Sequence, residues 1–286
     1  MRERRLGGLS VGEVGFGCAT ISVRAEPNEA TAVRALQAAI DAGVTLFDTA
    51  DVYNPPGQGA GHSELLLRRT VLARGGEDRA VVATKGGKYW TTDGEVHIDG
   101  RPEYLVQACE NSVRRLGLDC LPVYFFHEPD PHVPYAESIG ALAELRDRGL
   151  VREVGLSNVT LDQLGTALEI VPVSAVENRF SPCEREHDSL VDHCARLSIA
   201  FLPWGSLNGM RSPRGAQVAP RFQRVATNRG VSLEQLVIAW LLARSPAIVP
   251  IPGCSRPESV RDSVAGADLE LTSEERAELD ITDSPR

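Results

Sequence analysis

The chain has 286 residues, of which 42% are hydrophobic and 24% are charged, and its formal net charge is -9. This composition is typical of a globular protein whose core is large enough to need no metal or disulfide for stability. The negative charge argues against non-specific nucleic-acid binding, and no apolar run approaches the ~20 residues of a membrane span. The first residues carry charge but no apolar signal segment, so we expect a cytoplasmic protein.

The cysteines favour reduced thiols over a metal site. No C-x-x-C pair occurs, and no histidines cluster near the cysteines at the spacing of zinc ligands. We therefore expect no metal centre and mostly buried, reduced side chains for the six cysteines, which are Cys18, Cys109, Cys120, Cys183, Cys194 and Cys254.

The chain opens with "RRLGGLSV", which predicts a short β-hairpin with Gly7 and Gly8 at its turn. After it, short apolar runs alternate with longer segments of helical periodicity. Helices are expected over 28–43, 63–75, 101–117, 134–149 and 232–245, several of them ending at a glycine. Eight strands are expected, beginning at Val14, Thr45, Ala80, Pro122, Arg152, Ser174, Ile199 and Ala247.

The spacing of these strands predicts the fold. Their ends, near positions 17, 48, 85, 127, 157, 177, 204 and 251, lie 20 to 47 residues apart, and one βα unit of a barrel needs about 30. Strict alternation favours an α/β fold of the (β/α)8 TIM barrel type over a doubly wound sheet. No linker divides the chain, so we expect a single barrel domain over 1–286. The Gly- and Pro-rich segments 54–62 and 204–217 are expected to be functional loops.

Polar side chains stand at the ends of three consecutive predicted strands. Asp48 ends the second strand and Tyr53 follows it, Lys85 ends the third, and His127 ends the fourth. Each alone has an ordinary structural explanation, such as a turn cap, a rim side chain, a solvated end or a core histidine. Because parallel strands of a barrel end on one face, we expect the four to lie together.

These four side chains suit acid catalysis beside a carbonyl. A free tyrosine has a pKa near ~10, and a neighbouring ammonium lowers it by stabilising the phenolate. Lys85 would act in this way on Tyr53, Asp48 would hold Lys85, and His127 would orient a substrate carbonyl. Such a group supplies a proton but no electrons, so a hydride must come from a cofactor.

On these residues the chain resembles the aldo-keto reductases, as a short microbial-type member, over essentially its whole length. The family's Asp, Tyr, Lys and His tetrad matches Asp48, Tyr53, Lys85 and His127 in type, order and spacing. Further matches are "GFGCAT" on the first strand, "GLSN" at 155–158 and "IPGCSR" at 251–256. The resemblance implies reduction of an aldehyde or ketone to an alcohol, or the reverse oxidation, with Tyr53 as proton donor. It implies a small carbonyl or alcohol as substrate, no nucleic-acid or membrane partner, and a monomer or weak homo-oligomer.

The cofactor site is also read from the resemblance. Thr20 stands where a Rossmann fingerprint would have its third glycine, so the segment after Gly15 is a poor dinucleotide motif. An extended nicotinamide cofactor across the barrel mouth is implied instead. Arg256 opens the last barrel helix, where a guanidinium and a helix N-terminus favour a 2'-phosphate, and hence NADPH over NADH. The expected cofactor-binding residues are Thr20, Asp48, Ser157, Asn158, Glu177, Trp204, Gly205, Leu207, Gly253, Ser255, Arg256, Ser259 and Asp262.

Three positions depart from the family pattern. Glu177 replaces a common Gln that binds the nicotinamide carboxamide, and an ionised Glu cannot donate a hydrogen bond. Gly253 replaces a lysine of many eukaryotic members, and Ser263 stands where an adenine-contacting Asn is common. An alternative is that Glu177 turns aside to pair with Arg179 or another base. These departures bear on cofactor affinity and preference.

The expected substrate-contacting residues are Tyr53, Trp90, His127 and Glu128, with Tyr89 a further candidate. Trp90, Glu128 and Tyr89 are equally compatible with rim positions that contact no ligand. Two other functions fit the same barrel. One is a non-catalytic regulatory subunit that binds a nicotinamide nucleotide, and the other is an acid/base isomerase or lyase that needs no hydride.

Overall fold

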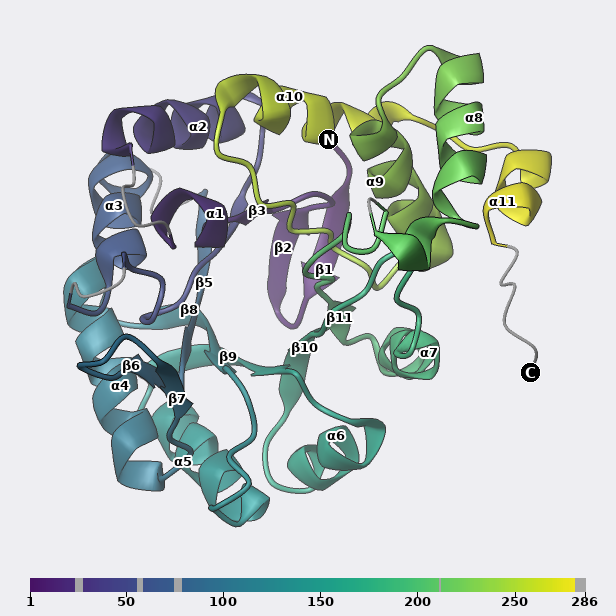
Figure 1. Cartoon of the computed structure of the whole chain (residues 1–286). Coiled ribbons are helices and arrows are strands. Elements are labelled where there is room, and N and C mark those ends of the chain that lie inside the picture. Colours follow the sequence, from purple (N-terminus) through teal and green to yellow (C-terminus); the bar gives the residue numbers. More distant parts are fainter. Residues whose placement is uncertain (24–27, 56–58, 75–78, 211, 281–286) are drawn as a thin grey trace.

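A curved parallel sheet lies at the centre of the molecule, and helices surround it (Figure 1). The computed structural model describes residues 1–23, 28–55, 59–74, 79–210 and 212–280. Seven strands pair in the order β11-β10-β9-β8-β5-β4-β3. Their bounds are β3 Phe16–Gly17, β4 Leu46–Asp48, β5 Val81–Gly86, β8 Leu121–Phe126, β9 Val151–Ser157, β10 Val173–Glu177 and β11 Ala200–Phe201. The (β/α)8 barrel predicted from the sequence is confirmed.

The segment 247–252, expected to be the eighth strand, closes the barrel without forming a strand. Its Val249 N–H donates to the Phe201 carbonyl at 2.8 Å on one side. On the other side, Gly15 and Gly17 donate to the carbonyls of Pro250 and Pro252 at 2.8 and 3.1 Å. Proline has no N–H, so neither residue can return a hydrogen bond. The expectation of a regular strand is wrong here, because the two prolines cannot donate the hydrogen bonds that would complete the ladder between this segment and the segment of Gly15 and Gly17.

Helix α4 begins and ends where the sequence predicts, whereas α3 ends at Thr70, and the glycine at 75 that was expected to end it lies outside the described residues. Helix α4 has Pro102 in its first turn and ends before Gly117, whose φ is +72°, a conformation that glycine adopts without strain. Helix α9 is buried on several sides, from Leu236 to Leu242. The α-helices are α1 Ala19–Ser22, α2 Glu29–Asp41, α3 His62–Thr70, α4 Pro102–Leu116, α5 Tyr135–Asp147, α6 Leu161–Leu168, α7 Asp188–Leu197, α8 Ala219–Arg229, α9 Leu233–Arg244, α10 Pro257–Ala265 and α11 Ser273–Leu279.

Short 3-10 turns accompany them at Leu72–Arg74, Pro213–Gly215 and Gly266–Asp268. Six helices lie outside the five segments that the sequence predicted to be helical, namely α1, α6, α7, α8, α10 and α11, although the start of α10 was expected at Arg256. Within the described part of the chain, no helix combines the length and the hydropathy needed to cross a bilayer.

The predicted N-terminal hairpin covers one end of the barrel. Strands β1 (Glu3–Leu6) and β2 (Leu9–Gly12) are antiparallel, with Leu6 opposite Leu9 across the Gly7–Gly8 turn. The buried Leu6, Leu9 and Val11 share a cluster with barrel-interior residues such as Phe125. A second cluster lies between the sheet and the helices. With its amino-terminal end filled, the barrel has its working mouth at the carboxyl ends of the strands.

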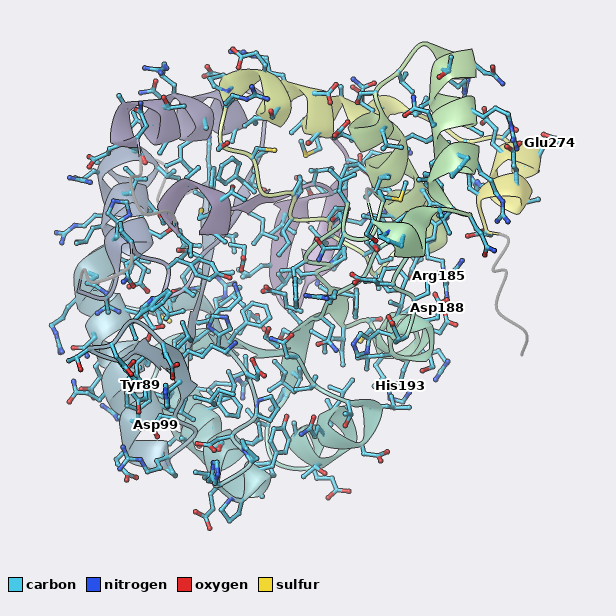
Figure 2. The ribbon with its side chains drawn as sticks, in the orientation of Figure 1. Tyr89, Asp99, Arg185, Asp188, His193 and Glu274 are labelled. Atoms are coloured by element: carbon cyan, nitrogen blue, oxygen red, sulfur yellow. The ribbon has the colours of Figure 1, made fainter. Side chains whose placement is uncertain are left out.

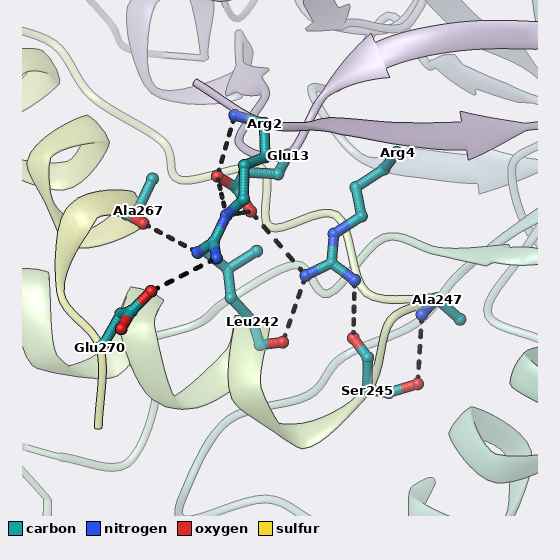
Figure 3. Close-up of polar contacts among 8 residues, drawn as sticks. All are labelled: Arg2, Arg4, Glu13, Leu242, Ser245, Ala247, Ala267 and Glu270. Carbon is teal, nitrogen blue, oxygen red and sulfur yellow. Dashed lines mark hydrogen bonds and ion pairs between the residues drawn. The ribbon is translucent and has the colours of Figure 1, made fainter. Parts of the chain in front are cut away.

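A buried glutamate ties this hairpin to the far end of the chain (Figure 3). Glu13 is 2% exposed and accepts a hydrogen bond from Arg2 Nε at 3.2 Å. Arg4, 3.9 Å from Glu13, also donates to the carbonyls of Leu242 and Ser245 at the end of α9. Arg2 also donates to the Ala267 carbonyl at 3.3 Å, so one buried carboxylate orients two arginines that join the N-terminal segment to the last third of the chain.

Substitution of Gly155 tests how closely side chains are packed inside the barrel. A Cβ at this position in β9 would overlap the ring of buried Phe125. We expect Gly155→Ala to lower the free energy of unfolding by about 1–3 kcal/mol, as overpacking of a filled core does. Gly165→Ala in α6 is the control, since nothing lies within 4 Å of its Cβ position, and it should be neutral or raise stability by about 0.5–1 kcal/mol. Denaturant midpoints of the two variants measure this, and equal midpoints would contradict the packing described.

Candidate active site

Three neighbouring strands bring the four predicted catalytic side chains together. Asp48 is the last residue of β4, Lys85 lies near the end of β5, and His127 follows β8 directly. Lys85 Nζ donates to Asp48 Oδ1 at 2.5 Å and lies 5.2 Å from the centre of the Tyr53 ring. The Tyr53 and His127 rings meet edge to face, with centroids 5.9 Å apart. The sequence pattern therefore identified a real cluster at the barrel mouth.

Lys85 is fully buried yet remains charged. Burial lowers the pKa of its ammonium, but the nearby Asp48, Glu177 and Tyr53 raise that pKa by more, so it ends above the ordinary value. Nζ also donates to the Thr49 carbonyl at 2.9 Å. The lysine is a fixed positive charge beneath the mouth of the barrel.

Glu177 is the second carboxylate on Lys85. It ends β10 across the barrel and is 2% exposed, and its Oε2 lies 3.2 Å from Lys85 Nζ. The possible partner Arg179 instead pairs with Glu184 at 3.3 Å and lies over the Trp204 ring at 4.7 Å. Glu177 thus pairs with a base, and that base is the lysine of the predicted tetrad.

Tyr53 does not have the lowered pKa that its lysine neighbour suggested. Burial raises the pKa of its phenol, the Lys85 ammonium lowers it, and Asp48 and Glu177 raise it again. The net direction is upward, because the loss of hydration on burial outweighs the attraction of the Lys85 ammonium for the phenolate. At neutral pH, Tyr53 is therefore a protonated phenol.

His127 is a neutral imidazole in this site. Burial lowers its pKa well below the ordinary value, and the ammonium groups of Lys85 and Lys88 lower it further. Its Nδ1 atom is buried and, within the described residues, has no hydrogen-bond partner. A neutral ring edge-on to Tyr53 can orient a carbonyl without competing for the proton of the phenol.

A cavity of about 570 Å³ opens above these side chains. Four of its lining residues have buried polar atoms that lack a hydrogen-bond partner in the part of the chain that the structure describes: Thr20 Oγ1, His127 Nδ1, Glu177 Oε2 and Ser206 Oγ. Buried polar atoms are nearly always paired, so their concentration here points to a polar ligand. The expected residues that line this cavity are Thr20, Asp48, Tyr53, His127, Ser157, Asn158, Glu177, Trp204, Gly205, Leu207, Gly253 and Ser259.

The remaining expected cofactor residues lie at or beyond the edge of this cavity. Asp262 turns toward α9, where it accepts hydrogen bonds from Ser232 Oγ at 2.8 Å and Gln235 Nε2 at 2.7 Å. Arg256 is the exposed residue that precedes α10, and Ser255 is half-buried beside it. Gly253 leaves room for Thr20, because a Cβ there would lie 2.7 Å from Thr20 Cγ2.

The hairpin of β6 (Lys88–Trp90) and β7 (Val96–Ile98) stands at the rim of the barrel. Trp90 donates from its indole nitrogen to the Val52 carbonyl at 2.9 Å, so it supports the loop that carries Tyr53. Tyr89 is 39% exposed, its ring lies against those of His97 and Tyr104, and it shares a surface groove with Asp99 (Figure 2). Glu128 pairs with Lys88 at 2.5 Å.

Lys88 itself lines the cavity, although the sequence pattern did not single it out. Its position three residues after Lys85 is the signal that could have found it, since one strand and a tight turn bring both to the mouth. Other lining residues that were not predicted come from β3 and α1, the loop after β11, α9 and the segment 251–254: Gly17, Ala19, Ser206, Asn208, Glu234, Val237, Ile238, Ile251, Pro252 and Cys254.

Comparison with known proteins agrees with this geometry. The Aldo/keto reductase family matches residues 13–284. The chain belongs to the aldo/keto reductase family. A protein of Schizosaccharomyces pombe named an uncharacterized oxidoreductase is 33% identical over 282 residues, which cover 96% of this chain and 88% of that protein.

Two solved structures extend the likeness of this aldo/keto reductase to the whole fold. The glycerol dehydrogenase of Gluconobacter oxydans has a TM-score of 0.86 and 25% identity, covering 97% of this chain and 94% of that one. An aldo/keto reductase from Klebsiella pneumoniae, in complex with NADP and acetate, has a TM-score of 0.80 and 25% identity, covering 97% and 93%. The chain is therefore an oxidoreductase by family.

Proposed function

We propose that this aldo/keto reductase catalyses the NADPH-dependent reduction of an aldehyde or ketone to an alcohol, or the reverse oxidation. The observation that carries the proposal is the buried cluster of Tyr53, Lys85, Asp48 and His127 at the floor of an open cavity. A protonated phenol beside a neutral imidazole suits a carbonyl oxygen that must gain a proton.

The chain's own residues fit a nicotinamide cofactor. The cavity's unpartnered Thr20, Ser206 and Glu177 oxygens offer hydrogen-bonding groups, and the indole of Trp204 offers an aromatic face. Ser157, Asn158 and Gly205 are proposed to complete the nicotinamide end, while Gly253, Ser259 and Arg256 are proposed to hold the phosphates. The structural relative from Klebsiella pneumoniae, described with NADP, supports this reading. When bound, the cofactor supplies the hydride that no side chain can provide.

Each residue of the tetrad has a proposed task. Tyr53 donates the proton to the carbonyl oxygen, and His127 orients that oxygen by a hydrogen bond. Lys85 stabilises the phenolate that remains, and Asp48 holds Lys85 at 2.5 Å. Lys88 and the loop around Leu207 are proposed to contact the substrate.

Turnover tests this proposal against the two alternatives. NADPH absorbance is followed with a panel of small aldehydes and ketones. A regulatory subunit would bind NADPH and leave it unoxidised. An isomerase or lyase would convert its substrate with no change in NADPH.

Tyr53→Phe removes the proposed proton and little else. We expect turnover to fall at least roughly 100-fold, because general acid catalysis contributes about 10²–10⁴. The dissociation constant for NADPH should change little, since Tyr53 is assigned to the carbonyl. Steady-state rates and fluorescence titration measure the two quantities. A fully active variant would remove Tyr53 from the mechanism.

Arg256→Ala tests the choice of cofactor. A charge-assisted contact to the 2'-phosphate is worth about 1.5–3 kcal/mol, so the Michaelis constant for NADPH should rise roughly 10- to 150-fold. That for NADH should barely change. Arg261→Ala is the matched control, since this arginine is also exposed and lies one turn further along α10. Equal weakening of NADPH and NADH would show that Arg256 does not read the 2'-phosphate.

A further inference from the structure

The two carboxyl groups on Lys85 form an unbalanced charge cluster. Asp48 Oδ1 and Glu177 Oε2 lie 2.5 and 3.2 Å from the same ammonium nitrogen, so these two oxygens are at most about 5.7 Å apart. The side chains of Lys85, Asp48 and Glu177 are 0%, 4% and 3% exposed. With both carboxyls ionised, the cluster would carry a net charge of −1 in a site almost without water.

Such a charge is costly, and a shared proton removes it. Burial of an uncompensated ion is strongly unfavourable, and two carboxyls in one site cannot both ionise easily. Asp48 has the shorter contact, with hydrogen-bond geometry, whereas Glu177 Oε2 lies near Nζ without it. Glu177 is therefore the better holder of the proton. Burial and the neighbouring Asp48 both raise the pKa of Glu177, in agreement.

Other charges around the cluster do not compensate it. The titratable neighbours Cys18 and Tyr53 have raised pKa values and His127 a lowered one, mainly through burial, so all three are uncharged near pH 7. Two cations near the mouth have carboxylate partners of their own: Lys88 pairs with Glu128 and Arg179 with Glu184.

Glu177 also lines the cavity beside Tyr53. The hydride donor and the proton donor must reach the same carbonyl, so the nicotinamide ring must lie at this end of the cavity. The ring is neutral when reduced and positive when oxidised. A positive ring would compensate a second ionised carboxylate, and a neutral ring would not.

We propose that Glu177 is protonated in the free enzyme and in the NADPH complex, and that it releases its proton to solvent when NADP⁺ binds. The carboxylic O–H bond breaks, the proton passes to buffer, and no electrons move. The oxidised complex then has ionised Asp48, Lys85 and Glu177 beside a cationic ring, with no net charge. This inference rests on the proposed nicotinamide function and adds a proton to it.

Proton linkage gives the test, with free enzyme and each cofactor. Release of one proton should tighten NADP⁺ binding by up to tenfold per pH unit while Glu177 is protonated in the free enzyme. The 2'-phosphate also titrates, with a pKa near ~6, but it is common to both cofactors. Fluorescence titration from pH 6 to 8 measures both dissociation constants. The constant for NADPH divided by that for NADP⁺ should rise with pH, and this ratio isolates the proton released by Glu177 from the titration of the phosphate.

Calorimetry counts the proton directly. Titration of NADP⁺ in buffers of different ionisation enthalpy should show release approaching one proton per site near pH 7, and titration of NADPH should show nearly none. Glu177→Gln should abolish the release and flatten the pH dependence. At pH 8 it should also shift the ratio of the two dissociation constants by roughly 3- to 30-fold in favour of NADPH, because an attractive charge is lost. Glu234→Gln, which removes a carboxylate on α9 that lines the same cavity, is the control and should keep the release.

The contrary outcomes are distinct. Binding of both cofactors with no release in the wild-type protein overturns the role of Glu177 and leaves the proposed function standing. Release that survives Glu177→Gln but disappears in Tyr53→Phe assigns the proton to the phenol instead. If neither cofactor binds, the proposed function fails, and this inference fails with it.

Discussion

The buried ammonium of Lys85 is the constraint on which the active site depends. A lysine without exposure would lose its charge unless carboxylates compensated for the lost hydration. Asp48 comes from the neighbouring strand β4, and Glu177 comes from β10, three places away from β5 in the sheet order. The second carboxylate reaches the lysine only across the interior of a closed barrel. The second carboxylate of the charge cluster is therefore in place only because the barrel is closed.

Closure is also where sequence reasoning reached its limit for the fold. Strand spacing predicted eight strands, and seven form with shifts of up to three residues at their ends. The eighth segment has the right place and length but carries Pro250 and Pro252. Hydrophobic periodicity depends on where apolar residues lie, so it does not reveal that a proline lacks the N–H group that a strand ladder needs. The carbonyls of these prolines still accept from Gly15 and Gly17, so closure survives without a regular ladder.

The candidate site divides in the same way. Asp48, Lys85 and His127 could be predicted because each stands at the carboxyl end of a strand, a position that topology alone defines. The partner of Glu177 could not be predicted in this way. The choice between Arg179 and a base elsewhere depends on which side chains face each other across the barrel. Trp90 shows a related limit. An aromatic residue near a mouth suggests a substrate contact, and that contact stays a prediction. The sequence did not indicate that the indole nitrogen donates to the Val52 carbonyl and so supports the loop that carries Tyr53.

The raised pKa of Tyr53 changes how the acid should be understood. Burial keeps the phenol protonated, and an acid that never ionises on its own depends on the field of Lys85 at the moment of transfer. Two ionised carboxylates on Lys85 would weaken that field. A proton on Glu177 leaves one carboxylate against one ammonium, which makes Tyr53 a stronger acid in the reduced complex, where a proton is needed. Once the nicotinamide is cationic, an ionised Glu177 stabilises it, and the requirement for a strong acid has passed. The departure at position 177 would in this way couple the acid strength of Tyr53 to the oxidation state of the cofactor.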